Sequence, residues 1–313
     1  MTTECFILTR AVHFGACLLF FGIFAFDRFV ATAIFSEGEN EIISHWQKRI
    51  RFFSLILLPL ILASGIFWFV LVAATMSGES PTIEILKTVW TQTQFGTVWL
   101  WRAVFWLAAV VAFVLFIFSK APPAFQRIHG WLQLFFSGLL LGSLAWAGHG
   151  QESSIYHLCA DILHLLVAGF WPTGLLPFFL ILRKLHPASK AAQINSIISL
   201  VRRFSASSLA SVALLAATGL VNSWFLVGSF GNLLGQTYGR WLLLKIILFG
   251  FAVMIGAVNL LRLKPRLAAE NSPGQKTEAT MAQLQFNVQM ELLLGAAIVI
   301  VVAILGVLPP AIH

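Results

Sequence analysis

Eight runs of about 20 apolar residues dominate this sequence, and few folds accept such runs. A helix needs about 20 apolar residues to cross the ~30 Å hydrocarbon layer of a membrane. The 313-residue chain is 59% hydrophobic and only 10% charged, and its mean hydropathy is +0.88. Soluble domains are close to half apolar and about a quarter charged. The composition therefore excludes a soluble fold and indicates an integral membrane protein.

The apolar runs must form helices. Lipid offers no hydrogen-bond partner to the backbone, and the alternative fold, a closed barrel, requires short strands of alternating polarity that these runs lack. We therefore predict an all-α integral membrane protein with about eight transmembrane helices. The predicted spans lie near residues 6–26, 50–74, 95–118, 128–147, 157–182, 204–228, 239–262 and 285–308.

Lysine and arginine fall mainly in alternate loops. Of the 20 basic residues, fifteen lie in the loops after the first, third, fifth and seventh spans, two lie in the intervening loops and three lie inside spans. Because basic loops stay in the cytoplasm, we expect both termini on the opposite side of the membrane. These loops account for the net charge of +8, so the charge does not indicate nucleic-acid binding.

The two halves of the chain share short patterns at equivalent positions. The matching pairs are Ala63-Ser64-Gly65 with Ala217-Thr218-Gly219, Gly96 and Arg102 with Gly239 and Lys245, and His13 with His164. An even number of spans per repeat gives two halves of the same orientation, related by an axis along the membrane normal. We predict a 4+4 parallel internal repeat, with residues 1–150 forming the first four-helix unit and residues 151–313 the second.

Histidines inside two of the spans are the main functional candidates, because ionisable side chains in a membrane are costly. His13 and His164 each lie roughly 10 Å below the outer surface, at a rise of 1.5 Å per residue. Equivalent positions in a two-fold repeat predict that these two side chains approach each other. His157 and Asp161 precede His164 by seven and three residues, which places all three on one helical face.

Two further residues extend this candidate site. Cys17 lies four residues after His13, on the same helical face, and His149 lies in the short Gly148-His149-Gly150 loop just outside the fourth span. Nitrogen ligands with one carboxylate and one thiol suit copper, and suit zinc less well. The predicted metal ligands are His13, His164, His149, His157, Asp161 and Cys17. The alternative is that each histidine is a separate interfacial residue.

Three other ionisable residues lie inside spans. Arg102 and Lys245 enter to about the depth of His13, where two cations would repel a metal ion. They would instead pair with acidic groups or hold the propionates of a haem b with axial ligands His13 and His164. Glu291 lies near the middle of the last span, where it must be protonated, paired or part of an ion path. The chain has no nucleotide-binding loop and no HExxH motif, so we do not expect an enzyme.

A series of short motifs extends over nearly the whole chain. They are Arg10-Ala11-Val12-His13-Phe14, Gly148-His149, Asp161-Ile162-Leu163-His164, Trp171, Gly174-Leu175, Thr218-Gly219, Asn222, Thr237-Tyr238-Gly239-Arg240, Lys245, Asn259, Pro265, Glu291 and Pro309-Pro310-Ala311. In order and spacing they resemble the copper resistance protein D family of bacterial inner-membrane proteins. One departure is Trp171-Pro172-Thr173-Gly174, where the family usually has a Trp-x-Gly-Gly type turn; Pro172 predicts a kink below His164.

The resemblance implies a function in copper handling. It implies an inner-membrane protein with both termini in the periplasm, which moves copper across the membrane together with a small periplasmic copper-binding protein of the copper resistance C type. Membrane lipid is the other expected partner, and nucleic acid is not expected. Two alternatives remain open at this point: a membrane cytochrome with non-covalent haem b, and a metal-binding protein that does not transport.

Overall fold

The computed structural model describes residues 3–32, 40–118, 123–147, 154–184, 191–269 and 275–311. Within these ranges the chain is helical and contains no strand, as predicted. Eight of the described helices are long and apolar enough to cross a membrane. The predicted number of spans and the all-α class are therefore confirmed for the described part of the chain.

The long helices run in the order expected from the apolar pattern. Their bounds are α1 (Thr3–Phe26), α3 (Asn40–Ser77), α5 (Gln94–Phe118), α6 (Pro123–Gly142), α7 (Ile155–Leu182), α8 (Ala191–Leu226), α10 (Thr237–Val258) and α12 (Gln275–Leu305). Two of them continue into wider π-helical turns, α1 into η1 (Asp27–Ala31) and α10 into η4 (Asn259–Leu263) followed by α11 (Lys264–Ala269). Helix α7 remains continuous through Pro172 and Pro177.

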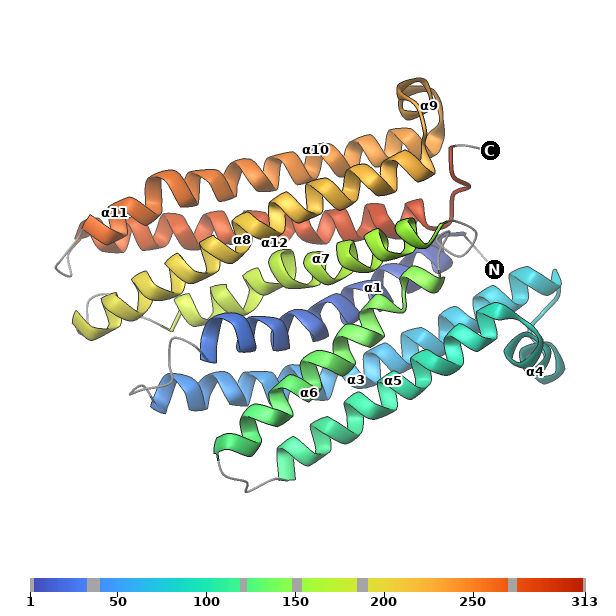
Figure 1. Cartoon of the computed structure of the whole chain (residues 1–313), viewed down its shortest axis with the longest axis horizontal. Coiled ribbons are helices and arrows are strands. Elements are labelled where there is room, and N and C mark those ends of the chain that lie inside the picture. Colours follow the sequence, from blue (N-terminus) through green and yellow to red (C-terminus); the bar gives the residue numbers. More distant parts are fainter. Residues whose placement is uncertain are drawn as a thin grey trace.

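Both ends of the chain lie at the same end of the bundle (Figure 1). Two short helices, α4 (Ile83–Gln92) and α9 (Phe230–Gly235), lie at that end too. A third, the single 3₁₀ turn η2 (Ala145–Ala147), follows α6. The described helices η1, α5, α7 and α11, each of which precedes a predicted basic-rich loop, end at the opposite end of the bundle (Figure 1). An even number of spans accounts for this arrangement.

Capping residues and glycines fix the two short helices. The side chains of Thr82 and Ser229 accept hydrogen bonds from the backbone of Ile85 and Asn232, which caps the first turn of α4 and α9. A Cβ atom at Gly96 would collide with backbone carbonyls at the end of α4, and a Cβ atom at Gly239 would collide with those of α9. Only glycine lets α5 and α10 begin so close to the preceding short helix.

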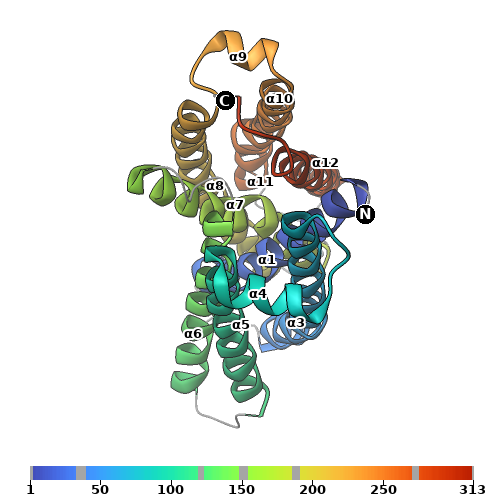
Figure 2. The ribbon, with the colours of Figure 1, turned by 90° about the vertical axis from the view of Figure 1, so that its right-hand side faces the viewer.

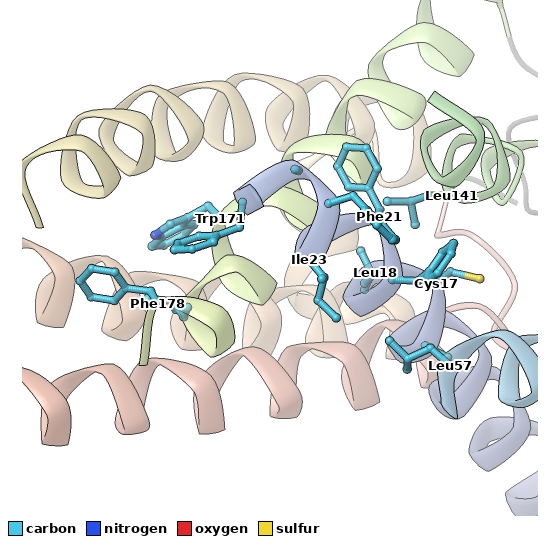
Figure 3. Packing of buried hydrophobic residues seen from close by; sticks show 14 of the residues in the cluster. Cys17, Leu18, Phe21, Ile23, Leu57, Leu141, Trp171 and Phe178 are labelled. Atoms are coloured by element: carbon cyan, nitrogen blue, oxygen red, sulfur yellow. The ribbon is translucent and has the colours of Figure 1, made fainter. Parts of the chain in front are cut away.

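Helix α1 lies at the centre of the bundle, against α3, α6, α7 and α12 (Figure 2). A larger share of α1 is buried than of any other described span. In Figure 3, the labelled side chains of this core are Cys17, Leu18, Phe21 and Ile23 of α1, Leu57 of α3, Leu141 of α6, and Trp171 and Phe178 of α7. The face of α1 that carries a candidate ligand therefore points into protein and away from lipid.

Small residues let α1 and α7 approach closely. A Cβ atom at Gly22 would overlap the side chain of Thr173 and the carbonyl of Gly169. The Thr173 hydroxyl bonds the Gly169 carbonyl and lies 3.2 Å from the carbonyl oxygen of Leu18. Without a strong hydrophobic force between helices in lipid, such close contacts and interhelical polar bonds hold a bundle together. This crossing joins the two halves of the chain.

Candidate functional site

His13 is one of the most deeply buried polar residues of the described chain, with 1% of its surface exposed. Its Nδ1 atom lies 2.9 Å from the Ser64 hydroxyl of α3, which itself donates to the Leu60 carbonyl over 2.6 Å. Because the hydroxyl hydrogen is directed to Leu60, the oxygen of Ser64 accepts from His13 Nδ1–H. The lone pair of this neutral imidazole is therefore on Nε2.

Arg102 of α5 faces that lone pair. Its Nη2 atom is 2.6 Å from His13 Nε2, and a guanidinium group only donates hydrogen bonds, which agrees with the assigned tautomer. The same side chain donates to the Leu140 carbonyl at 3.0 Å and to the Ser143 hydroxyl at 2.7 Å, both in the α6 region. Cys17 Sγ lies 3.8 Å from His13 Nε2. Histidine, thiol and guanidinium thus converge on one point.

Aromatic rings surround this first cluster. The Trp68 and Trp99 rings lie 5.5 and 5.8 Å from the His13 ring, centroid to centroid. The Arg102 guanidinium lies over Trp99, and the Arg10 guanidinium lies over Trp68 at 4.7 Å. Ring faces attract cations, most strongly where water is excluded. These contacts help to hold two buried arginines next to His13, where no carboxylate of the described residues is bonded to either.

His164 of α7 repeats the first arrangement with residues of the second half. Its Nδ1 atom lies 2.9 Å from the Thr218 hydroxyl of α8, which donates to the Leu214 carbonyl over 2.7 Å. The same reasoning places the hydrogen on Nδ1 and the lone pair on Nε2. The glycine after each hydroxyl residue adjoins the imidazole: a Cβ atom at Gly65 would be 3.2 Å from His13 Cε1, and one at Gly219 would be 3.6 Å from His164 Cε1.

The predicted polar face of α7 contacts α8 along successive turns. Asp161 accepts a hydrogen bond of 3.0 Å from the Asn222 amide, and the His157 ring stacks on Phe225 at 4.9 Å. With the bond from His164 to Thr218, three side chains of one α7 face meet three residues of α8. Lys245 of α10 interacts electrostatically with both Asp161 and His164. It is the counterpart of Arg102 in position, but it has an acidic neighbour.

Five of the six predicted ligands divide between these two clusters. His13 and Cys17 lie in the first, and His157, Asp161 and His164 lie in the second, while His149 lies outside the described residues. The hydrogen bonds of His13 and His164 direct each ring to helices of its own half. Among the described residues, no group of three or more His, Cys, Asp or Glu side chains forms a metal-binding arrangement. A shared metal site therefore stays a prediction.

Four contributors were not among the predicted ligands. Ser64 and Thr218 orient the histidines, and Trp68 and Trp99 enclose the first one. The signal for the hydroxyl residues was present in the sequence, since Ala63-Ser64-Gly65 and Ala217-Thr218-Gly219 match between the halves. Asn222, known from the sequence only as part of a motif, bonds across helices to Asp161.

Comparison with known proteins identifies the family. The copper resistance protein D-like N-terminal domain matches residues 1–158, and the copper resistance protein D family matches residues 198–305. Copper resistance protein D of Pseudomonas syringae pv. tomato is 34% identical over 255 residues, which cover 77% of this chain and 78% of that protein.

Two other relatives extend the comparison. Inner membrane protein YebZ of Escherichia coli is 26% identical over 309 residues, covering 97% of this chain and 98% of that protein. Copper transport protein CutJ of Bacillus subtilis is 32% identical over 166 residues, covering 50% of this chain and 30% of that protein. These names refer to copper or to the membrane, and none refers to haem or to an enzyme. The chain is a multi-pass inner-membrane protein connected with copper, and it belongs to the copper resistance protein D family.

Proposed function

We propose that this protein transports copper across the bacterial inner membrane, and that His13 and His164 are the central copper ligands in its outer half. One observation carries the proposal. Both imidazoles donate Nδ1–H to a hydroxyl group that is itself bonded to a backbone carbonyl, so both present the Nε2 lone pair. A neutral imidazole with a fixed tautomer is the form that binds a metal ion.

The first proposed copper site, which we call the first station, combines the nitrogen of His13 with the sulfur of Cys17. Bonds of about 2.0 Å to imidazole nitrogen and about 2.3 Å to thiolate sulfur are typical of first-row metal sites. One ion between His13 Nε2 and Cys17 Sγ, which are 3.8 Å apart, therefore fits without a change in the backbone of α1, which carries both residues. Thiolate ligands favour copper(I). Arg102 donates to the same lone pair, so copper binding requires this guanidinium to turn away while Leu140 and Ser143 continue to bind it.

The second station is more acidic. His164, His157 and Asp161 share the face of α7 that meets α8, and Lys245 lies within electrostatic range. His149 would complete this station from the loop that precedes α7. If copper displaces Lys245 from His164, the lysine remains near the Asp161 carboxylate. The negative charge of Asp161 then offsets part of the electrostatic repulsion between Lys245 and the copper ion.

The paired contacts support the 4+4 parallel repeat of residues 1–150 and 151–313. Each half places a histidine of its first long helix against a hydroxyl of its second, and a cation of its third near that histidine. Each half also has a short helix before its third long helix, and a glycine in the first turn of that long helix packs against the short one. In transporters, substrate sites commonly lie at the interface of such repeats. We therefore assign one copper station to each repeat.

The basic-rich connections support an orientation with both termini in the periplasm. The two stations then face the periplasm, where a small copper-binding protein of the copper resistance C type would exchange copper with them. The haem b alternative receives no support from the relatives.

The proposal is tested with purified protein in liposomes. Copper(I) movement into the lumen should require the protein, and His13→Ala and His164→Ala should each reduce the rate at least about tenfold, in the range expected for loss of a metal-site interaction. His186→Ala, predicted on the cytoplasmic side, is the matched control. If copper binds to the protein and this binding requires the two histidines, but no copper reaches the lumen, the protein binds copper without transporting it.

A further inference from the structure

A third polar cluster lies away from the histidines, where the end of α10 meets the middle of α12. Glu291 of α12 is only 3% exposed. Its Oε1 atom accepts a hydrogen bond of 2.7 Å from Asn259 Nδ2, and Asn259 Oδ1 accepts one of 2.6 Å from Asn287 Nδ2. The three side chains form a short chain of hydrogen bonds that ends on the carboxyl group.

A cavity of about 120 Å³ adjoins this cluster. Residues of α7, α8, α10 and α12 line it, and its polar lining beyond Glu291 and Asn259 consists of Ser205 and Ser208. Glu291 is the only ionisable residue in the lining, which also includes no His, Cys or Met among the described residues. The second carboxyl oxygen, Oε2, lies beside Gly256, where the missing side chain leaves room next to the carboxyl group.

The backbone is irregular at this place. Helix α10 ends at Val258, and the wider π-helical turn η4 begins at Asn259, the residue that bonds the carboxyl group. Single π-helical turns are rare and frequently occur at functional sites. The widened turn therefore begins at the residue that bonds the buried carboxyl group of Glu291.

No cation of the described chain balances Glu291. The ion pair of the described residues joins Asp27 and Arg28, at the far end of α1. The elements packed against α12 carry the charged groups Glu4 and Arg10 of α1, Asp161 of α7, Arg240 and Lys245 of α10, Arg262 of η4, and Lys264 and Arg266 of α11, besides Lys276 and Glu278 on α12 itself. None of them lines the cavity or interacts electrostatically with Glu291. An isolated buried carboxylate is very costly, and such a group takes up a proton instead.

We infer that Glu291 is a proton-binding site, at which the carboxylate takes up a proton within the membrane and returns it through the cavity. A metal cation is a poorer occupant, because Asn259 turns its N–H to the carboxyl group and its oxygen is already used by Asn287. This leaves too few oxygen ligands for a hard cation, and the lining has no soft ligand for copper. The inference goes beyond copper transport and does not depend on it.

Dicyclohexylcarbodiimide tests this inference, since this apolar reagent reacts with protonated carboxyl groups in membranes. The carboxyl proton moves to a reagent nitrogen while a carboxyl oxygen bonds to the central carbon, and the adduct rearranges to a stable N-acylurea with no atom lost. Full-length protein in native membranes, without added copper, is treated over a pH series. Peptide mass spectrometry should find Glu291 modified, with the modified fraction falling at least about tenfold as the pH rises through its titration.

Two variants sharpen the experiment. Glu291→Gln keeps an acceptor for Asn259 and should abolish the modification, while Glu278, exposed at the start of the same helix, should stay unmodified in all samples. Asn259→Ala removes the bond that favours the charged form, so modification should persist to higher pH. Absence of modification at every pH, a modified fraction independent of pH, or protection by copper(I) or Na⁺ at constant pH would each overturn the inference. A failure of copper transport in liposomes would leave it unaffected.

Discussion

The Nε2 atom of His13 and the Nη2 atom of Arg102 lie 2.6 Å apart in the protein interior. A guanidinium is an unusual neighbour for a metal ligand, because its charge repels the ion and its N–H group occupies the lone pair that the ion needs. In the second half the corresponding cation, Lys245, interacts electrostatically with His164, and its acidic neighbour Asp161 offsets part of its charge. The two proposed stations are therefore expected to differ in how strongly the neighbouring cation opposes copper.

We therefore predict that Arg102 lowers the copper affinity of the first station. In a His164→Ala background, Arg102→Leu should raise the copper(I) affinity by about tenfold, since a hydrogen bond with a charged donor is worth about 1.5–3 kcal/mol and 1.4 kcal/mol corresponds to a factor of ten. Competition with a colorimetric copper(I) chelator measures the affinity. Arg240→Leu, an exposed position on α10, is the control. Unchanged or weaker binding by the Arg102 variant would contradict the assigned competition.

The hydroxyl partners of the histidines should matter nearly as much as the ligands. Ser64→Ala and Thr218→Val remove the acceptor for Nδ1–H, and copper affinity should then fall about 10- to 100-fold, as for other residues that orient a metal ligand. Ser64→Thr restores a hydroxyl and should recover most of the affinity. Ser77→Ala, exposed at the end of the same helix, is the control. Equal affinity of the Ser64→Ala variant and the parent protein would remove the orienting role.

The position of both histidines within their helices was predictable, but their neighbours were not. Apolar run length and a fixed rise per residue place His13 and His164 within their helices, and heptad spacing places His157 and Asp161 on the face that meets α8. Which helix each imidazole faces depends on how α1 and α7 cross. That crossing is set by the contact of Gly22 with Thr173, residues far apart in the sequence.

The short helices and the cavity escaped prediction for related reasons. Helix α4 is too short and too polar to register as a span, although Thr82 is a recognisable N-cap three residues before its partner Ile85. Glu291 was recognised as an ionisable residue in a span, and Asn259 only as part of a motif. Their pairing depends on the packing of α12 against α10 and on the π-helical turn. No local periodicity encodes that turn.

Membrane topology gives a direct test of the orientation. Single cysteines introduced at positions 271 and 272, in a background with Cys5, Cys17 and Cys159 replaced by serine, should not react with an impermeant maleimide in intact cells. They should react after the membrane is permeabilised, because the basic-rich connections are expected in the cytoplasm. A cysteine at position 229, at the start of α9, should already react in intact cells. Labelling of the 271 or 272 position in intact cells would reverse the assignment of both termini.

The pH dependence of copper binding separates imidazole ligands from sulfur ligands. A proton and a copper ion compete for the same Nε2 lone pair, so affinity should fall as the medium is acidified, by up to about tenfold per pH unit for each imidazole that must lose a proton. The sign follows from the neutral form being the ligand: high pH favours binding and low pH opposes it. Asp161 as an additional ligand would extend the loss to lower pH.

The measurement is copper(I) affinity over a pH series that extends below the range in which an exposed histidine changes charge, because burial and the nearby Arg102 and Lys245 disfavour a charged imidazole. Cys5, Cys17 and Cys159 are replaced by serine. The cysteine-free protein should retain binding, and its affinity should decline on the acidic side. Adding His13→Ala or His164→Ala should make that decline less steep, because one competing proton site is removed each time. A flat profile through the whole pH series, or binding that disappears with the cysteines alone, would assign the copper to sulfur and not to the two histidines.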